Sequence, residues 1–477
     1  MTVDQFTQQA EETGPTLRRT LGPWGVIALG IGAIIGAGLF SLTGIAAAEN
    51  AGPAVVLSFV VAAIGCAFAG MCYSEFAALI PVAGSAYTYS RATLGEFIAW
   101  IIGWDLVLEY AVGAATVSVS WSSYVGSLLR DLGVVLPASV AHGPFDPVHG
   151  LINVPAIVIV VALSLLLMRG IRESAAVNAL IVVVKVTIVI VFIAVGAFFI
   201  HTRNYQPFIP PNTGTFGEFG WSGIMRGAGV IFFAYIGFDA VSTAAQEAHK
   251  PHRTMPIGII GSLAICTVLY VAFALVLTGM VNYRVMHGDA APVATAIDLT
   301  PFPWLQLMIK LGIIFGFTSV ILVMLLGQSR VFFAMARDGL LPPLFAKVHP
   351  KWHTPWRSNL VFLVFVSAIA GLVPITKLGH MTSIGTLLAF VLVCTGIIVL
   401  RRTRPDLPRP YRTPLVPFVP AAGILVCFAM MYSLGIETWY RLIGWLVIGL
   451  VIYFGYSRAH ARAARVTTDP DLRPHSV

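Results

Sequence analysis

A single lysine, Lys185, stands in the middle of a long apolar segment. Residues 175–200 read AAVNALIVVVKVTIVIVFIAVGAFFI and hold no other ionisable side chain. A segment of this length and polarity predicts a membrane span. A charge at mid-depth costs at least about 2.5 kcal/mol on insertion scales, so such residues face a partner, a cavity or a transport path. Lysine also loses its proton readily on burial, which suits it to carry protons.

Three carboxylic acids, Asp105, Glu109 and Asp239, are expected at similar depth in other apolar segments. Asp105 and Glu109 are four residues apart, which places them on one face of a helix. Three acids and one base cannot all be ionised cheaply in a low dielectric, so some must be protonated, solvated or open to a cavity. This composition is expected of a proton relay. A buried salt-bridge cluster that only fixes helix packing explains the same residues and stays open.

Cysteines, histidines and known catalytic motifs give no sign of catalysis or metal binding in this sequence. All five cysteines fall within predicted spans without a CxxC pair, and no histidine is predicted inside a span. The sequence also lacks GxSxG, HExxH and paired in-span catalytic aspartate motifs. We therefore expect no enzyme, no cofactor and no metal site, and acids and lysine must do any work on ions.

The composition is that of a polytopic membrane protein. Of 477 residues, 57% are hydrophobic and 10% are charged, and the mean hydropathy is +0.86. A soluble core cannot absorb this excess. No cleavable signal peptide is expected, because residues 1–19 are polar. About twelve helices are predicted, at 23–48, 54–80, 94–122, 151–169, 174–200, 222–247, 256–281, 304–332, 358–374, 383–400, 416–434 and 439–457.

Basic residues gather in the two tails and in every second connecting segment. The positive-inside rule then predicts that both termini are cytoplasmic, and an even number of spans agrees. The net charge of +8 reflects this topology. We expect contact with membrane lipid and no nucleic-acid partner.

The first and sixth predicted spans are interrupted by glycine. They contain GIGAIIGAGLF at 30–40 and GAGVIFFAYIGFD at 227–239. Glycine also permits close helix packing, which is the plainer interpretation of either segment alone. These two spans correspond, however, if the chain is two five-helix repeats, and by the predicted topology the repeats are inverted. Paired interruptions of this kind point to the binding site of a secondary transporter.

Broken spans free backbone groups that can line a cavity but cannot be left bare in lipid. The half-helix that begins after Gly36 offers N–H groups and a positive dipole end, which suits a carboxylate. The half-helix that ends near Phe233 offers carbonyls, which suit an ammonium. Together they predict a receptor for the α-amino and α-carboxyl groups of an amino acid.

At these residues the sequence resembles a known group of transporters. GAIIGAGLF (32–40) resembles the first-helix motif of the amino acid–polyamine–organocation superfamily, and residues 81–110 resemble its second-to-third-helix signature. Residues 231–259 and 326–355 are similar to the cationic amino acid transporter family within it. The resemblance implies an all-α fold with five-plus-five inverted repeats, broken helices 1 and 6, and two further C-terminal helices. About twelve spans fit a bacterial-type member, hence the bacterial inner membrane.

This resemblance divides the chain into five segments. They are a cytoplasmic tail at 1–22, a first repeat at 23–200, a second repeat at 222–400, two additional helices at 416–457 and a cytoplasmic tail at 458–477.

The resemblance also gives substrate roles to residues by position. The backbone segment that holds the substrate carboxylate matches Ile34, Ile35, Ala37 and Gly38, and the carbonyls that hold its amino group match Phe233, Ala234 and Ile236. Phe233 also matches the aromatic outer gate. Met324 should face the side-chain end of the site, where a bulky thioether disfavours Arg or Lys as substrate; core packing explains Met324 equally well.

Lys185 matches a lysine that stands where sodium-driven relatives bind their ion, and Thr318 and Ser319 match two former ligands of that ion. A fixed ammonium there favours proton over sodium coupling, with Lys185, Glu109, Asp239 and Asp105 as the coupling residues. We predict proton-coupled amino acid uptake by alternating access. Exchange against a metabolite or polyamine stays open, and a non-transporting sensor is disfavoured. No disulfide-linked ancillary subunit is expected, because residues 123–150 contain no cysteine.

Overall fold

The computed structural model describes residues 22–79, 85–170, 175–239, 241, 248–352 and 354–461. Within these residues the regular structure is helical, and no β-strand is present. Seven helices of the described part are long and apolar enough to cross a membrane, and four shorter apolar helices accompany them. The prediction of an all-α polytopic membrane protein is confirmed.

Each predicted span contains a helix. The first five spans contain α2 (Pro23–Ile34) with η1 (Gly38–Leu42), α3 (Thr43–Ala46) and η2 (Ala47–Ala51); α4 (Val55–Leu79); α6 (Glu96–Val107), η4 (Leu108–Val112) and α7 (Gly113–Asp131); α9 (Val154–Met168); and α10 (Ala175–Gly196). The other seven contain α11 (Gly220–Ile231) with η7 (Phe232–Tyr235); α12 (Pro251–Met280); α14 (Pro303–Arg337); α15 (Trp356–Leu372); α16 (Ile375–Thr403); α17 (Phe418–Ser433); and α18 (Ile436–Ile452). Among the connections, α5 (Ser85–Thr93) and α13 (Pro292–Ile297) are helical.

Three boundaries correct a prediction. α16 begins at Ile375 rather than at residue 383, so His380 lies inside a membrane-length helix. Longer helices than predicted likewise include His252, in Pro251–Met280, and His460, in Ile436–Ala461. The expectation that no histidine lies within a span is therefore wrong. Polar residues interrupt the apolar pattern between Ile375 and Gly385, but backbone pairing continues through them because helix formation does not require an apolar side chain at every position.

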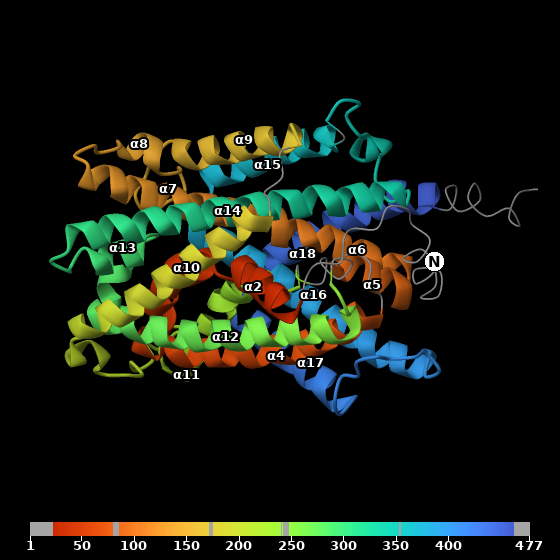
Figure 1. The fold of residues 1–477 in the computed structure, drawn as a ribbon, viewed down its shortest axis with the longest axis horizontal. Coiled ribbons are helices and arrows are strands. Elements are labelled where there is room, and N and C mark those ends of the chain that lie inside the picture. Colours follow the sequence, from red (N-terminus) through yellow and green to blue (C-terminus); the bar gives the residue numbers. More distant parts are fainter. Residues whose placement is uncertain are drawn as a thin grey trace, which may run out of the picture.

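Helices of two groups lie on opposite sides of the bundle in Figure 1. Along one side α4 packs against α12, α11 and α17, and along the other α9 packs against α15 and α7. α14 packs on α7, while α10 contacts α14, α12 and α2. The short helix α2 is thus enclosed by α10 and α12, so its broken end lies among protein groups rather than lipid, as free backbone groups require.

Both glycine-rich spans are broken, as predicted. α2 ends at Ile34, Ile35 has an extended backbone with ψ of 109°, and helical structure resumes before Gly38. α11 passes into the 3₁₀ turn η7, after which Ile236 is extended and Gly237 has a φ of +115°. Only glycine adopts that φ without strain. The continuation of the sixth span, at 240 and 242–247, lies outside the described residues.

Candidate substrate and proton site

The two breaks lie against each other. A Cβ atom added to Gly38 would lie 2.2 Å from the Cα atom of Ala234, and one added to Gly237 would lie 2.7 Å from the carbonyl oxygen of Ala33. Only residues without a Cβ allow two backbones to approach this closely. The first and sixth spans therefore cross at their breaks, and backbone rather than side chains forms the crossing.

Both backbone N–H donors and backbone carbonyl acceptors are available at the crossing. The carbonyl of Gly36 accepts the N–H groups of Leu39 and Phe40, which makes the residues just after Gly36 the start of a new helix. The first N–H groups of a helix have no partner within it, and here they include those of Ala37 and Gly38. Because Gly38 contacts Ala234, these donors lie close to the carbonyls at the end of the other broken helix.

Tyr270 of α12 connects the two breaks. Its Oη atom lies 3.0 Å from the carbonyl oxygen of Ile34 and 3.0 Å from that of Ala234. The side chain is fully buried, and its ring packs against Phe59 and Tyr235. A phenol has one proton, so it donates to only one of these two carbonyls at a time. Sequence reasoning missed this residue, because a lone tyrosine in an apolar span carries no signal of its partners.

The residues predicted to hold substrate are all buried, and they are continuous with the crossing. Those of the first span are Ile34, Ile35, Ala37 and Gly38, and those of the sixth are Phe233, Ala234 and Ile236. Their roles toward substrate stay a prediction.

Met324 lies on α14, against the third span. A Cβ atom on Gly113 would be 3.1 Å from its Sδ atom, and Met324 is buried. The same helix repeats the arrangement further along, where the Sδ atom of Met335 would lie 2.6 Å from a Cβ on Gly103. Both thioethers therefore fill the space that a glycine of the third span leaves.

Lys185 links three helices. Its Nζ atom donates to the carbonyl oxygen of Gly32, in the last turn of α2, at 2.8 Å. Its methylene stem packs on Gly316 of α14, where an added Cβ would lie 3.2 Å from Cε. The residue is 1% exposed. Lys185 therefore joins α10 to the broken helix and to α14, as expected of a residue that responds to movement of the first span.

Thr318 and Ser319, which the resemblance matches to former sodium ligands, form hydrogen bonds within the protein. Ser319 donates to the carbonyl of Gly316 at 3.0 Å, and Thr318 donates to that of Ile314 at 2.8 Å. Thr318 also accepts the indole N–H of Trp121 at 3.1 Å. Both hydroxyls thus have protein partners.

The three acids gather around the third span. Glu109 faces Asp239 and the hydroxyl of Thr386, with Asp105 also close by. Tyr110 donates to Asp239 at 3.5 Å. Within the described residues, no hydrogen bond of good geometry reaches either carboxyl oxygen of Asp105 or of Glu109, and both side chains are 1% exposed. Two carboxyls that face one another in a dry interior are not both charged.

Ion pairs also join the helices at both ends of the bundle, and sequence reasoning did not find them. At the end that carries α13, the fully buried ammonium of Lys310 binds Asp131 at 2.6 Å and Asp298 at 2.8 Å. At the opposite end, Arg91 of α5 pairs with Asp338, just after α14, which also accepts the hydroxyl of Tyr87. Apart from Asp298 and Lys310, which are 12 residues apart, these contacts join residues far apart in the chain, which composition and spacing do not reveal.

Comparison with known proteins agrees with this architecture. The amino acid permease family matches residues 21–453. The chain is 46% identical to the branched-chain amino acid permease BcaP of Bacillus subtilis, covering 94% of this chain and 95% of that one. It is 42% identical to the methylthioribose transporter of Bacillus subtilis, covering 95% and 97%, and 38% identical to the chloroplastic cationic amino acid transporter 9 of Arabidopsis thaliana, covering 82% and 68%. The chain belongs to the amino acid permease family, and it is a transporter rather than an enzyme.

Proposed function

We propose that this amino acid permease takes up neutral amino acids with apolar side chains, together with protons, across a bacterial plasma membrane. The observation that carries the proposal is the crossing of the two breaks, which Tyr270 connects through the carbonyls of Ile34 and Ala234. Such a crossing offers donors for a carboxylate and acceptors for an ammonium within one small region.

Recognition of the two charged groups follows from this geometry. The substrate carboxylate binds the N–H groups of Ala37 and Gly38 at the start of the resumed helix. The substrate ammonium binds the carbonyls of Phe233, Ala234 and Ile236. Since Tyr270 has one proton for two carbonyls, an ammonium that donates to Ala234 allows the hydroxyl to donate to Ile34, so substrate and hydroxyl together satisfy both breaks.

Met324 limits which substrate side chains the site accepts. Its thioether occupies the space beside Gly113, which limits the length of a substrate side chain directed toward α14. A relative at 46% identity is named for branched-chain amino acids, which have short apolar side chains. Both observations favour neutral apolar substrates over arginine or lysine.

Coupling rests on Lys185 and the acids. A protonated Lys185 donates to the carbonyl of Gly32 and so stabilises the position of α2. Loss of that proton weakens the contact and releases the helix. Glu109 and Asp239 face one another and share a proton, which makes them the acidic members of the relay, with Asp105 nearby. Proton binding and substrate binding then favour the same conformations, as coupling requires.

Alternating access requires one end of the helix bundle to face the cytoplasm and the other to face the outside. We place both termini in the cytoplasm and the end that carries α13 outside, in keeping with the distribution of basic residues. Phe233, buried beside Ala234 in the sixth-span break, then covers the bound substrate from the outside as the outer gate.

The test is uptake of radiolabelled leucine into proteoliposomes under an imposed inward pH gradient, with sodium present or absent. We expect accumulation that follows the pH gradient and needs no sodium. Methyl esters and N-acetyl derivatives should not compete, because each removes one of the two groups that the breaks bind. If leucine methyl ester competes as well as leucine does, the two breaks do not bind the substrate carboxylate as proposed.

Two further measurements distinguish the proposed function from other transport activities. Efflux from preloaded vesicles that requires external amino acid, without net uptake under a pH gradient, identifies an exchanger instead. Competition by methylthioribose, the substrate named for a relative at 42% identity, contradicts recognition through α-amino and α-carboxyl groups, because this sugar has neither.

A further inference from the structure

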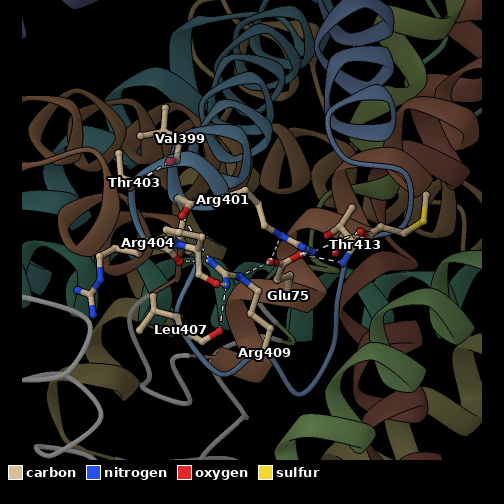
Figure 2. A network of polar contacts seen from close by, with 11 residues as sticks. Glu75, Val399, Arg401, Thr403, Arg404, Leu407, Arg409 and Thr413 are labelled. Carbon is tan, nitrogen blue, oxygen red and sulfur yellow. Dashed lines mark hydrogen bonds and ion pairs between the residues drawn. The ribbon is translucent and has the colours of Figure 1, made fainter.

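A buried glutamate clamps the α16–α17 connection to α4. Figure 2 shows Glu75, near the end of α4, bound by two arginines. Arg401 contacts both carboxyl oxygens at 2.9 Å, and the Nε atom of Arg409 lies 3.3 Å from one of them. The backbone N–H of Thr413 donates to the same carboxylate at 2.7 Å, and its hydroxyl donates to Met71 of α4 at 3.1 Å. Glu75 is fully buried, so this is a fixed, dry contact rather than a surface ion pair.

Arg409 also fixes the shape of the connection itself. Its guanidinium donates to four backbone carbonyls, those of Leu400, Arg404, Pro405 and Leu407. The connection therefore folds around one buried arginine (Figure 2). Its backbone is therefore held in place before any partner binds, which lowers the entropy lost on binding.

The outward face of this connection is positive. Arg402 and Arg412 are exposed, and Arg404 is partly exposed beside Asp406, 3.5 Å away. Together these three arginines and Asp406 carry a net formal charge of +2. Glu75 balances only one of the two arginines that bind it, so Arg401 and Arg409 together leave one further positive charge behind this surface.

The positive face borders an apolar one. Leu415 and Phe418 are each 75% exposed; Phe418 is the first residue of α17, and Leu415 stands three residues before it. Arg412 stands three residues before Leu415, so the positive and the apolar surfaces meet at the start of α17.

We propose that Arg402, Arg404 and Arg412, with Leu415 and Phe418, bind an anionic phospholipid of the cytoplasmic leaflet. The arginines bind its phosphate and the apolar pair contacts its acyl chains, the combination that holds basic segments at membrane surfaces. Because Glu75 ties this surface to α4, a bound lipid also stabilises the joined arrangement of α4 and α16. The proposal uses the predicted cytoplasmic side but none of the transport steps.

The experiment measures thermal unfolding of the full chain in detergent with added phosphatidylglycerol or phosphatidylcholine. We expect phosphatidylglycerol to raise Tm by several degrees more than phosphatidylcholine, and the excess to shrink as salt is raised. The double variant Arg402→Gln/Arg412→Gln should lose at least half of this excess. In phosphatidylcholine its Tm should equal that of the parent, because both side chains are exposed and the Glu75 contacts remain.

The matched control is Arg169→Gln, which removes an exposed arginine at the end of α9. It should keep the full phosphatidylglycerol excess. An undiminished excess in the double variant, an equal loss in Arg169→Gln, or no excess in the parent overturns the proposal. Stabilisation by inorganic phosphate to the same extent also overturns it, since a free anion would then suffice. No transport is measured, so the result is independent of the proposed function.

Discussion

The Nζ atom of Lys185 lies 2.8 Å from the carbonyl oxygen of Gly32, and Gly32 stands in the last turn of α2. The last four carbonyls of a helix have no partner within it, and a cation beside them also meets the negative end of the helix dipole. The lysine therefore stabilises the end of the broken helix in its present position. Its charge and the position of the first span are directly linked.

Replacement of Lys185 should separate coupling from packing. Lys185→Ala should lose proton-driven accumulation at least tenfold while keeping part of the exchange activity, which needs only binding and isomerisation. Lys185→Gln keeps a hydrogen-bond donor toward Gly32 without a titratable proton, so it should restore exchange but not accumulation. Both are measured in proteoliposomes with and without a pH gradient.

The control is Lys377→Ala, which removes an exposed lysine and should leave both activities intact. If Lys185→Gln restores accumulation as well, the residue fixes the packing of α2, α10 and α14 and does not carry the proton.

The hydroxyl of Tyr270 should matter for substrate affinity. Tyr270→Phe leaves the carbonyls of Ile34 and Ala234 without this donor, and an unsatisfied buried acceptor costs about 1–3 kcal/mol. We expect substrate affinity to fall by roughly five- to a hundredfold, as measured by tryptophan fluorescence or thermal shift. Tyr205→Phe is the matched control, because it removes a hydroxyl that donates to Leu275 of the same helix α12, away from the breaks. Equal losses in both variants assign the effect to α12 rather than to the crossing.

Much of this arrangement follows from local sequence. The spans follow from apolar length, the breaks from glycine in the first and sixth spans, and the importance of Lys185 from its isolation in an apolar segment. Each of these signals lies within about twenty residues. The amino acid permease family and the all-α membrane fold follow from them together.

The contacts that sequence reasoning missed join distant positions. Tyr270 contacts a carbonyl 236 residues away, and Arg401 contacts Glu75 across 326 residues. The members of each pair come together only when the helices pack. Nothing in the sequence distinguishes this tyrosine or this arginine from others of the same type. His380 was misplaced for a different reason, since the polar start of α16 hides a helix that begins at Ile375.

Glycine at the crossing should be indispensable. Gly38→Ala places a Cβ 2.2 Å from the Cα atom of Ala234, and backbone cannot yield as a flexible side chain can. We expect loss of substrate binding and a lower Tm, because the two breaks are forced apart. Gly126→Ala is the control, since nothing lies within 4 Å of an added Cβ there, and transport should persist. Normal transport by Gly38→Ala contradicts the crossing.

Glu109 and Asp239 should act as one unit. Glu109→Gln and Asp239→Asn each keep shape and remove a titratable group, so each should reduce proton-driven accumulation at least tenfold while exchange persists. Because the two carboxyls face one another, the double variant should be little worse than either single one. Substrate-induced proton uptake, followed with an internal pH dye, reports the same loss. Glu437→Gln, whose side chain is 80% exposed, is the control. Full proton uptake by both single variants leaves these acids a structural role only.

Met324 should set the length of the accepted side chain. Met324→Ser removes the thioether that fills the space beside Gly113, so the variant should bind longer side chains, arginine included. The matched control is Met335→Ser, which removes the thioether packed against Gly103 on the same helix. Large-to-small changes at buried methionines cost about 2–5 kcal/mol, so both variants should lose similar stability, and only Met324→Ser should change specificity. A thermal-shift screen of the amino acids measures both properties at once. An unchanged substrate range in a folded Met324→Ser protein assigns this methionine to packing.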